Sequence, residues 1–210
     1  MSDYLMPAKN GQHEVVIDKS RFICHVYRVW NVEEANAYIY EIKKEHGKAN
    51  HNCVAYQIGE NNEIQRAFDD GEPTGTAGIP MLDVLKRGDI RNCLVIVTRY
   101  FGGVKLGAGG LIRAYGNTVS AGIQAVGLVH RIPLVSVWLS CEYTLSNTLQ
   151  SKIHALNYEV GNVEYGEKVK IEALVEKERV DSFVNWVVAF THNRVTPVIG
   201  DTSYQEKPKS

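Results

Sequence analysis

Three carboxylates within four residues are the first feature of this sequence that could do chemistry. Asp69, Asp70 and Glu72 lie in FDDGEPTGTAGIP, residues 68–80, where the Asp-Gly and Glu-Pro pairs favour turns. Hydroxyl groups and backbone amides follow at Thr74, Gly75, Thr76 and Gly78. Such a turn could hold Mg²⁺ through oxygen ligands, supply a general base, or form ion pairs with cations elsewhere in the chain.

A glycine-rich stretch, TRYFGGVKLGAGGLIRAY at residues 98–115, supplies cations at Arg99, Lys105 and Arg113 and contains no acid. It lacks the Gly-Lys-Ser/Thr of a Walker loop, and GAGGLI lacks the last glycine of a dinucleotide-binding fingerprint. What remains is an apolar strand, a glycine loop and a helix. The free N–H groups of the helix would point into the loop and form an anion site, where Lys105 and Arg113 would add phosphate-binding charge. The alternative is that the glycines have a purely structural role and only allow the chain to turn there.

The two stretches could instead form ion pairs with each other and have only a structural role. Three negative and three positive side chains in the two most glycine-rich segments could pair across a groove, and this reading needs no ligand. His51 and Cys53 lie two residues apart and would share one face of a strand. They could form a Cys–His nucleophilic pair, or His51 could be a packed or surface residue with no catalytic role. Tyr100 and Phe101 could stack on bases or belong to the core.

Composition sets limits on these chemistries. The 44% hydrophobic and 22% charged residues are typical of a soluble globular protein. A net charge of −1 gives no strong global field, so any affinity for a polyanion must come from local clustering. No apolar run approaches the roughly 20 residues that cross a bilayer, and we see no secretory signal. We expect a cytoplasmic protein with reduced, buried cysteines.

Two segments with different patterning must position these residues, with the boundary at RIP, residues 131–133. We expect one domain over 1–131 and a second over 132–210. The first reads as an α+β layer, a sheet with its helices packed on one side. Its central strand, NCLVIVTRY, is apolar at successive positions, as a strand covered on both faces would be. The second reads as a ferredoxin-like βαββαβ domain followed by a disordered tail, QEKPKS.

The stretches DDGEPTGTAGIPMLDVL and VTRYFGGVKLGAGGLIRAY resemble the paired signatures of the YigZ/IMPACT family, and KSRFICHV and HNCVAYQIG extend the resemblance through the first segment. The second segment resembles the short C-terminal domain of bacterial members. The resemblance implies a first domain similar to domain 2 of ribosomal protein S5 and a second similar to the C-terminal domain of elongation factor G. The eukaryotic relative regulates translation through protein contacts, and bacterial members look like nucleic-acid or ribosome binders by fold analogy.

We therefore expect a non-catalytic, monomeric regulator of translation, with no cofactor, no metal and no membrane contact. Its first domain would bind RNA, the ribosome or a translation-associated protein at a cleft between the acidic turn and the glycine loop. The alternative is an enzyme of S5-like fold that binds a nucleotide with Mg²⁺. The expected binding residues are Asp69, Asp70, Glu72, Thr74, Gly75, Thr76, Gly78, Arg99, Tyr100, Gly102, Gly103, Lys105, Gly107, Gly109, Gly110 and Arg113.

Overall fold

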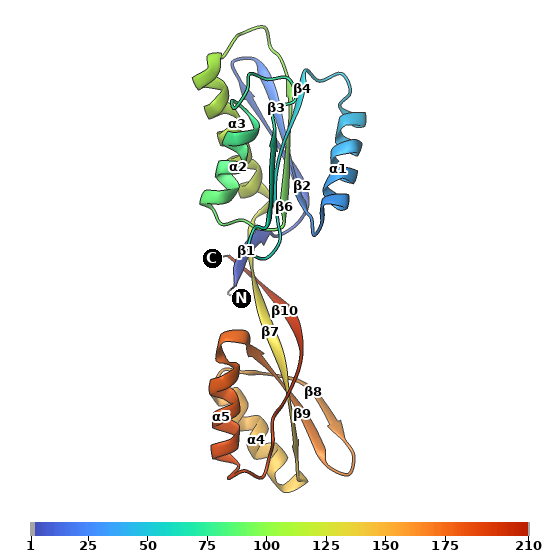
Figure 1. Ribbon diagram of the computed structural model, residues 1–210, viewed down its shortest axis with the longest axis vertical. Helices are drawn as coiled ribbons and strands as arrows, with labels where there is room; N and C mark the ends of the chain where they lie inside the picture. The colour runs from blue at the N-terminus through green and yellow to red at the C-terminus, as the bar shows by residue number, and fades with distance from the viewer. Residues whose placement is uncertain (1–2, 210) are drawn as a thin grey trace. The chain divides into compact units, whose positions relative to one another are not determined.

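The computed structural model describes residues 3–209 and divides into two compact units. Residues 4–130 and 207–209 form the N-terminal unit, and residues 131–206 form the C-terminal unit. Each unit is α+β, as expected (Figure 1).

The N-terminal unit is built on an antiparallel five-stranded sheet of order β2-β3-β6-β4-β5. Its strands are β2 (Gly11–Ile17), β3 (Ser20–Arg28), β4 (His51–Ile58), β5 (Ile64–Phe68) and β6 (Cys93–Tyr100). The central strand β6 is buried along almost its whole length, because successive side chains of a strand enter opposite faces of the sheet. The prediction of a strand covered on both faces is confirmed.

Helices lie on both faces of this sheet, so the expectation of a one-sided layer is wrong. Helices α2 (Gly78–Arg87) and α3 (Gly107–Val126) cover one face, and α1 (Val32–Glu45) covers the other (Figure 1). Val95 and Val97 of β6 pack in the core under α2 and α3, while Leu94 and Ile96 pack in the core under α1. The apolar run that predicted a doubly covered strand already required this second layer.

Local signals set the helix boundaries. The Asn31 side chain caps α1 by accepting a hydrogen bond from the Glu34 N–H. Glycine inside α3 allows a close approach to the sheet, because a Cβ at Gly122 would lie 2.5 Å from the Sγ of Cys24. Helix α3 begins at Gly107, so the second half of the expected glycine loop is its first turn.

The C-terminal unit has the expected βαββαβ order, and its strands follow the order β10-β7-β9-β8. The short strand β1 belongs to the N-terminal unit and pairs with β7, whose first residues, 128–130, belong to that unit as well. Helices α4 and α5 cover one face of this sheet (Figure 1). The element bounds are β1 (Tyr4–Pro7), β7 (Leu128–Cys141), α4 (Tyr143–Ala155), β8 (Glu159–Tyr165), β9 (Val169–Glu176), a 3₁₀ turn (Lys177–Arg179), α5 (Val180–Phe190) and β10 (Val198–Pro208).

The expectation of a disordered tail is wrong over most of QEKPKS, because β10 continues to Pro208. Polar composition predicted disorder, but β10 pairs with the long strand β7, and backbone hydrogen bonds do not depend on apolar side chains. The Arg131–Glu206 ion pair, at 3.3 Å between Nη1 and Oε1, adds a side-chain tie. Among the described helices, none is long and apolar enough to cross a bilayer.

Candidate anion-binding site

Asp69 lies outside helix α2 and caps the start of the helix with its carboxylate. Its carboxylate accepts hydrogen bonds from the backbone N–H groups of Gly75, Ala77 and Gly78, at 2.8, 3.1 and 2.8 Å. Burial alone would raise the pKa of Asp69, but these three bonds outweigh it and the pKa is lowered. The residue therefore supplies a cap that α2 otherwise lacks, since no side chain caps the helix at Ala77.

Asp70 holds the turn against α1 and β4. Its carboxylate lies 2.6 Å from the Lys43 Nζ and accepts a 2.7 Å bond from the Asn52 N–H. Burial favours a raised pKa, but the Lys43 and Asn52 bonds together hold the pKa of Asp70 below its usual value. The Asp70 carbonyl lies 2.9 Å from the Nδ1 of His51.

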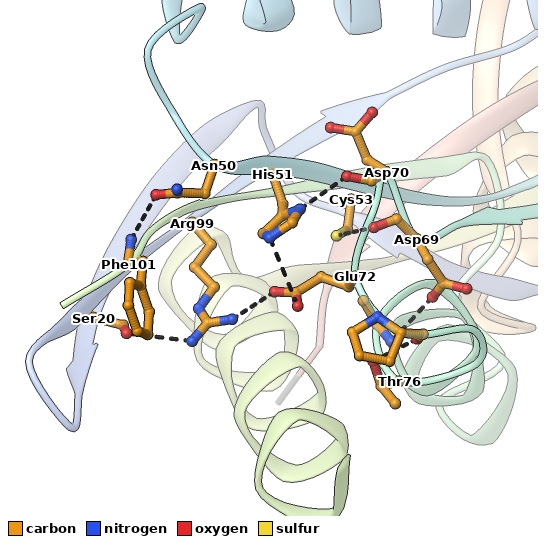
Figure 2. Close-up of polar contacts among 12 residues, drawn as sticks. Ser20, Asn50, His51, Cys53, Asp69, Asp70, Glu72, Thr76, Arg99 and Phe101 are labelled. Atoms are coloured by element: carbon orange, nitrogen blue, oxygen red, sulfur yellow. Dashed lines mark hydrogen bonds and ion pairs between the residues drawn. The ribbon is translucent and has the colours of Figure 1, made fainter. Parts of the chain in front are cut away.

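Glu72 and Arg99 form a buried ion pair between the acidic turn and the end of β6 (Figure 2). Arg99 Nη1 lies 2.7 Å from Glu72 Oε1, and the two side chains are 6% and 4% exposed. The Tyr115 hydroxyl donates to the same oxygen at 2.7 Å, and His51 Nε2 lies 3.8 Å from the other. The expected pairing between the two stretches is thus confirmed for Glu72 and Arg99. Asp70 pairs instead with Lys43 of α1, which was not among the expected partners.

The three carboxylates are consequently already occupied by protein donors. Mg²⁺ would have to displace the backbone amides on Asp69, the ammonium on Asp70 or the guanidinium on Glu72. Within residues 3–209, no three side chains of the His, Cys, Asp and Glu types are placed to ligate one metal ion.

A pocket of about 260 Å³ lies where the acidic turn meets the glycine-rich stretch. Glu72 and Arg99 line it together with apolar side chains, and Lys105 is exposed beside it. The Arg99 guanidinium carbon lies 5.3 Å from the Phe22 ring centre and 5.6 Å from that of Phe101. The full lining is Glu72, Pro73, Arg99, Phe101, Lys105, Leu106, Gly107, Ala108 and Leu111.

The N-terminus of α3 opens onto this pocket through Gly107 and Ala108. Leu106 precedes the helix without a capping side chain, and the first turn contains no acid. Gly107 has a φ of 66°, and a Cβ at Gly109 would meet nothing within 4 Å. The first turn thus combines free N–H groups, the positive end of the helix dipole and little steric cover, which together favour an anion.

Several expected binding residues do not line the pocket, and Gly102 and Tyr100 have structural contacts instead. Gly102 packs on the turn between β2 and β3, where a Cβ would overlap the backbone of Lys19 and Ser20. The Tyr100 hydroxyl lies 3.0 Å from His46 Nδ1. Arg113 is exposed on α3 and does not line the pocket. Thr74, Gly75, Thr76, Gly78, Gly103, Gly109 and Gly110 also do not line it.

His51 and Cys53 do share a face, but the thiol is not an activated nucleophile. Cys53 Sγ donates to the Asp69 carbonyl at 2.9 Å, and burial raises the pKa of the thiol to about 12. A thiolate at neutral pH would require a lowered pKa. The pair therefore holds the acidic turn onto β4.

Sequence reasoning missed two polar residues that hold the loop after β6. Ser20 Oγ accepts from the Gly102 N–H at 3.1 Å. Asn50 Oδ1 accepts from the Phe101 N–H at 2.8 Å (Figure 2). Ser20 lies inside KSRFICHV, which carried part of the family resemblance, so a signal for it existed. Nothing in the sequence pattern distinguishes Asn50 from a surface loop residue.

The fold and this site define a class of two-domain α+β proteins in which an S5-like domain with an uncapped, glycine-rich helix start precedes a ferredoxin-like domain. Residues 18–123 match the Impact N-terminal domain and residues 139–194 match a domain of unknown function, DUF1949. The chain belongs to the IMPACT family.

Relatives support this assignment over the whole chain. The chain is 44% identical to IMPACT family member YvyE of Bacillus subtilis, over 99% of this chain and 95% of that protein. It is 33% identical to IMPACT family member YigZ of Escherichia coli, over 87% and 91%. A match of 41% identity to the Protein IMPACT homolog of Schizosaccharomyces pombe spans 42% of this chain and 32% of that protein. A crystal structure of a hypothetical protein, 30% identical, superposes with a TM-score of 0.61 over 94% of this chain and 97% of that one.

Proposed function

We propose that this IMPACT family protein is a non-catalytic, translation-associated protein of the cytoplasm whose N-terminal domain binds single-stranded RNA. The observation that carries the proposal is the pocket at the uncapped start of α3, with Lys105 exposed beside it. RNA would place a phosphate at the first-turn N–H groups and the Lys105 ammonium, since both favour negative charge.

Neutralised acids make this end of the domain suitable for a polyanion. Asp69, Asp70 and Glu72 would repel phosphate if they were free, but each accepts hydrogen bonds from protein donors, and Lys43 and Arg99 balance two of them. The negative charge near the pocket is thereby offset before any ligand arrives.

Two further exposed lysines lie at the same end of the sheet. The Lys19 backbone packs against Gly102, and Lys48 comes two residues before Asn50, whose N–H donates to the Arg99 carbonyl at 3.0 Å. With Lys105, they give the loops at this end three exposed cations in a chain of nearly neutral charge. We expect Lys19, Lys48 and Lys105 to contact successive phosphates, in place of the buried Arg99 and of Arg113, which does not line the pocket.

The Phe101 side chain favours a single strand over a duplex. It is 46% exposed and belongs to the loop that leads into Lys105. Exposed aromatic rings beside cations are the usual platform for unpaired bases, whereas paired bases keep their faces covered. The rival enzyme reading is less favoured, because a nucleotide–Mg²⁺ complex would need carboxylate oxygens that already have protein donors.

Binding of a labelled single-stranded oligoribonucleotide at several salt concentrations tests the proposal. Three phosphate contacts predict that the logarithm of affinity falls against the logarithm of salt with a slope of roughly −2. Lys105→Gln should reduce the slope by about 0.7, the contribution of one contact. Lys86→Gln is the matched control, since Lys86 is an exposed cation in the last turn of α2. Absence of binding at low salt, or an equal loss with Lys86→Gln, would refute the proposal.

A further inference from the structure

The pocket beside Lys105 is largely apolar, which a phosphate site alone does not explain. Pro73, Phe101, Leu106, Ala108 and Leu111 line it. Phosphate groups are bound by charge and N–H donors, so these walls must accommodate another part of a ligand. The volume of about 260 Å³ is somewhat below that of pockets for drug-sized molecules and suits one planar ring system.

One wall of the pocket offers a stacking surface of defined orientation. The Phe101 N–H is held by Asn50 Oδ1 at 2.8 Å, and the Phe101 ring lies over the Arg99 guanidinium. Arg99 in turn lies over Phe22, which is fully buried. Figure 2 shows Arg99 between Phe101 and Glu72. Because these groups hold one another, a ring that stacks on Phe101 meets a supported surface.

A polar group at the pocket also lacks a partner. Arg99 lines the pocket and is 5% exposed, and its Nε–H has no acceptor among the described residues, although Nη1 and Nη2 bond to Glu72 and Ser20. A buried donor without an acceptor is destabilising, so an acceptor on a ligand would improve the site. The Nε atom is covered, so an acceptor reaches it only when the side chains over it move.

We propose that this pocket holds the base of one nucleotide, with the phosphate of that nucleotide at Lys105 and the first turn of α3. The inference rests on the RNA-binding function proposed above. A nucleobase supplies all three missing features together, since it is planar, it presents ring-nitrogen or carbonyl acceptors, and it is joined to a phosphate. An apolar peptide side chain would fill the hollow but would leave Arg99 Nε–H and the free N–H groups of α3 without acceptors.

The test separates the base from the phosphate. A single-stranded oligoribonucleotide is compared with an oligomer of equal length and charge whose sugars carry no bases. Loss of one stacked base should weaken binding about 5- to 100-fold. Ala108→Phe, which adds a ring to the pocket from an exposed position of its lining, should remove the preference for the oligomer that carries bases. Ala37→Phe, on the exposed face of α1, should behave like the unaltered protein.

Competition in the unaltered protein gives a readout that does not depend on a variant. A nucleoside monophosphate should displace the oligomer at lower concentration than ribose 5-phosphate does. Equal competition, or equal binding of the two oligomers by the unaltered protein, would overturn the inference and leave RNA binding standing. Displacement by an apolar peptide but not by the nucleotide would also overturn it. If neither oligomer binds at low salt, the RNA-binding function fails as well.

Discussion

Glu72 and Arg99 lie 27 positions apart in the sequence and form a buried ion pair with a 2.7 Å contact between Oε1 and Nη1. The pair joins the acidic turn to the end of the central strand. The two side chains also neutralise each other where they line the pocket, so neither of them presents an unpaired charge to a ligand. Lys105 and the start of α3 remain to attract an anion.

Breaking this pair should destabilise the N-terminal domain. Glu72→Gln keeps the shape but leaves the Arg99 charge buried without a counterion, and we expect a loss of about 3–5 kcal/mol in the free energy of unfolding. Urea denaturation can be followed through Trp30, after Trp138 and Trp186 are replaced by Phe. Lys105→Gln, an exposed neighbour, should change stability by less than about 0.5 kcal/mol. A loss below about 1 kcal/mol for Glu72→Gln would show that the pair is not desolvated as described.

Two glycines of the same stretch should respond in opposite ways to Ala. At Gly102 an added Cβ overlaps the backbone of Lys19 and Ser20, so Gly102→Ala should cost about 1–3 kcal/mol. At Gly109 the Cβ meets nothing within 4 Å inside a helix, so Gly109→Ala should add up to about 1 kcal/mol. The same denaturation experiment measures both. Equal effects would contradict the packing of Gly102 on the β2–β3 turn.

Stability should fall as the pH is lowered through the range in which His25 titrates. Burial lowers the pKa of His25 to about 4, and the nearby His46 contributes in the same direction. Above about pH 6.5 both the folded and unfolded forms are neutral at this residue, and below it only the unfolded form gains a proton. The domain should therefore lose about 3 kcal/mol between pH 6.5 and 4. Urea midpoints across this range should be flatter for His25→Gln, and equal slopes would exclude His25 as the source.

The four cysteines should be unreactive in the folded protein. All four are buried, and burial raises the pKa of Cys24 and Cys53 to about 12 and raises those of Cys93 and Cys141. A thiol-specific reagent should modify them only as fast as the domains open, and rapidly in denaturant. Fast modification of Cys53 without denaturant would contradict its contact with Asp69 and reopen the nucleophilic reading.

Sequence patterns predicted the parts of this fold that depend on local physics. The apolar run of β6 predicted a strand covered on both faces, because burial on both faces requires apolar side chains at successive positions of the chain. The second helical layer was missed although the β6 pattern required it, since which helix covers which face is a tertiary matter. The order of residues 205–208 was missed because it comes from pairing with β7, not from composition.

The sequence predicted where the site lies better than it predicted the roles of the side chains there. The charges of the acidic turn and the glycine-rich stretch predicted that the two could pair, and Glu72 and Arg99 do form an ion pair. Types and spacing could not show that Asp69 caps α2, that Lys43 neutralises Asp70, or that Arg113 does not line the pocket. Those facts depend on where α1, α2 and α3 begin and end.

The most direct measurement is an amide chemical-shift titration of the N-terminal domain within the full chain, with a single-stranded oligoribonucleotide at low salt. The account predicts that the amides of Lys105 and of residues 107–110 shift first and that added salt reverses the shifts. Shifts that appear elsewhere while these amides stay unchanged would contradict a phosphate site at the start of α3.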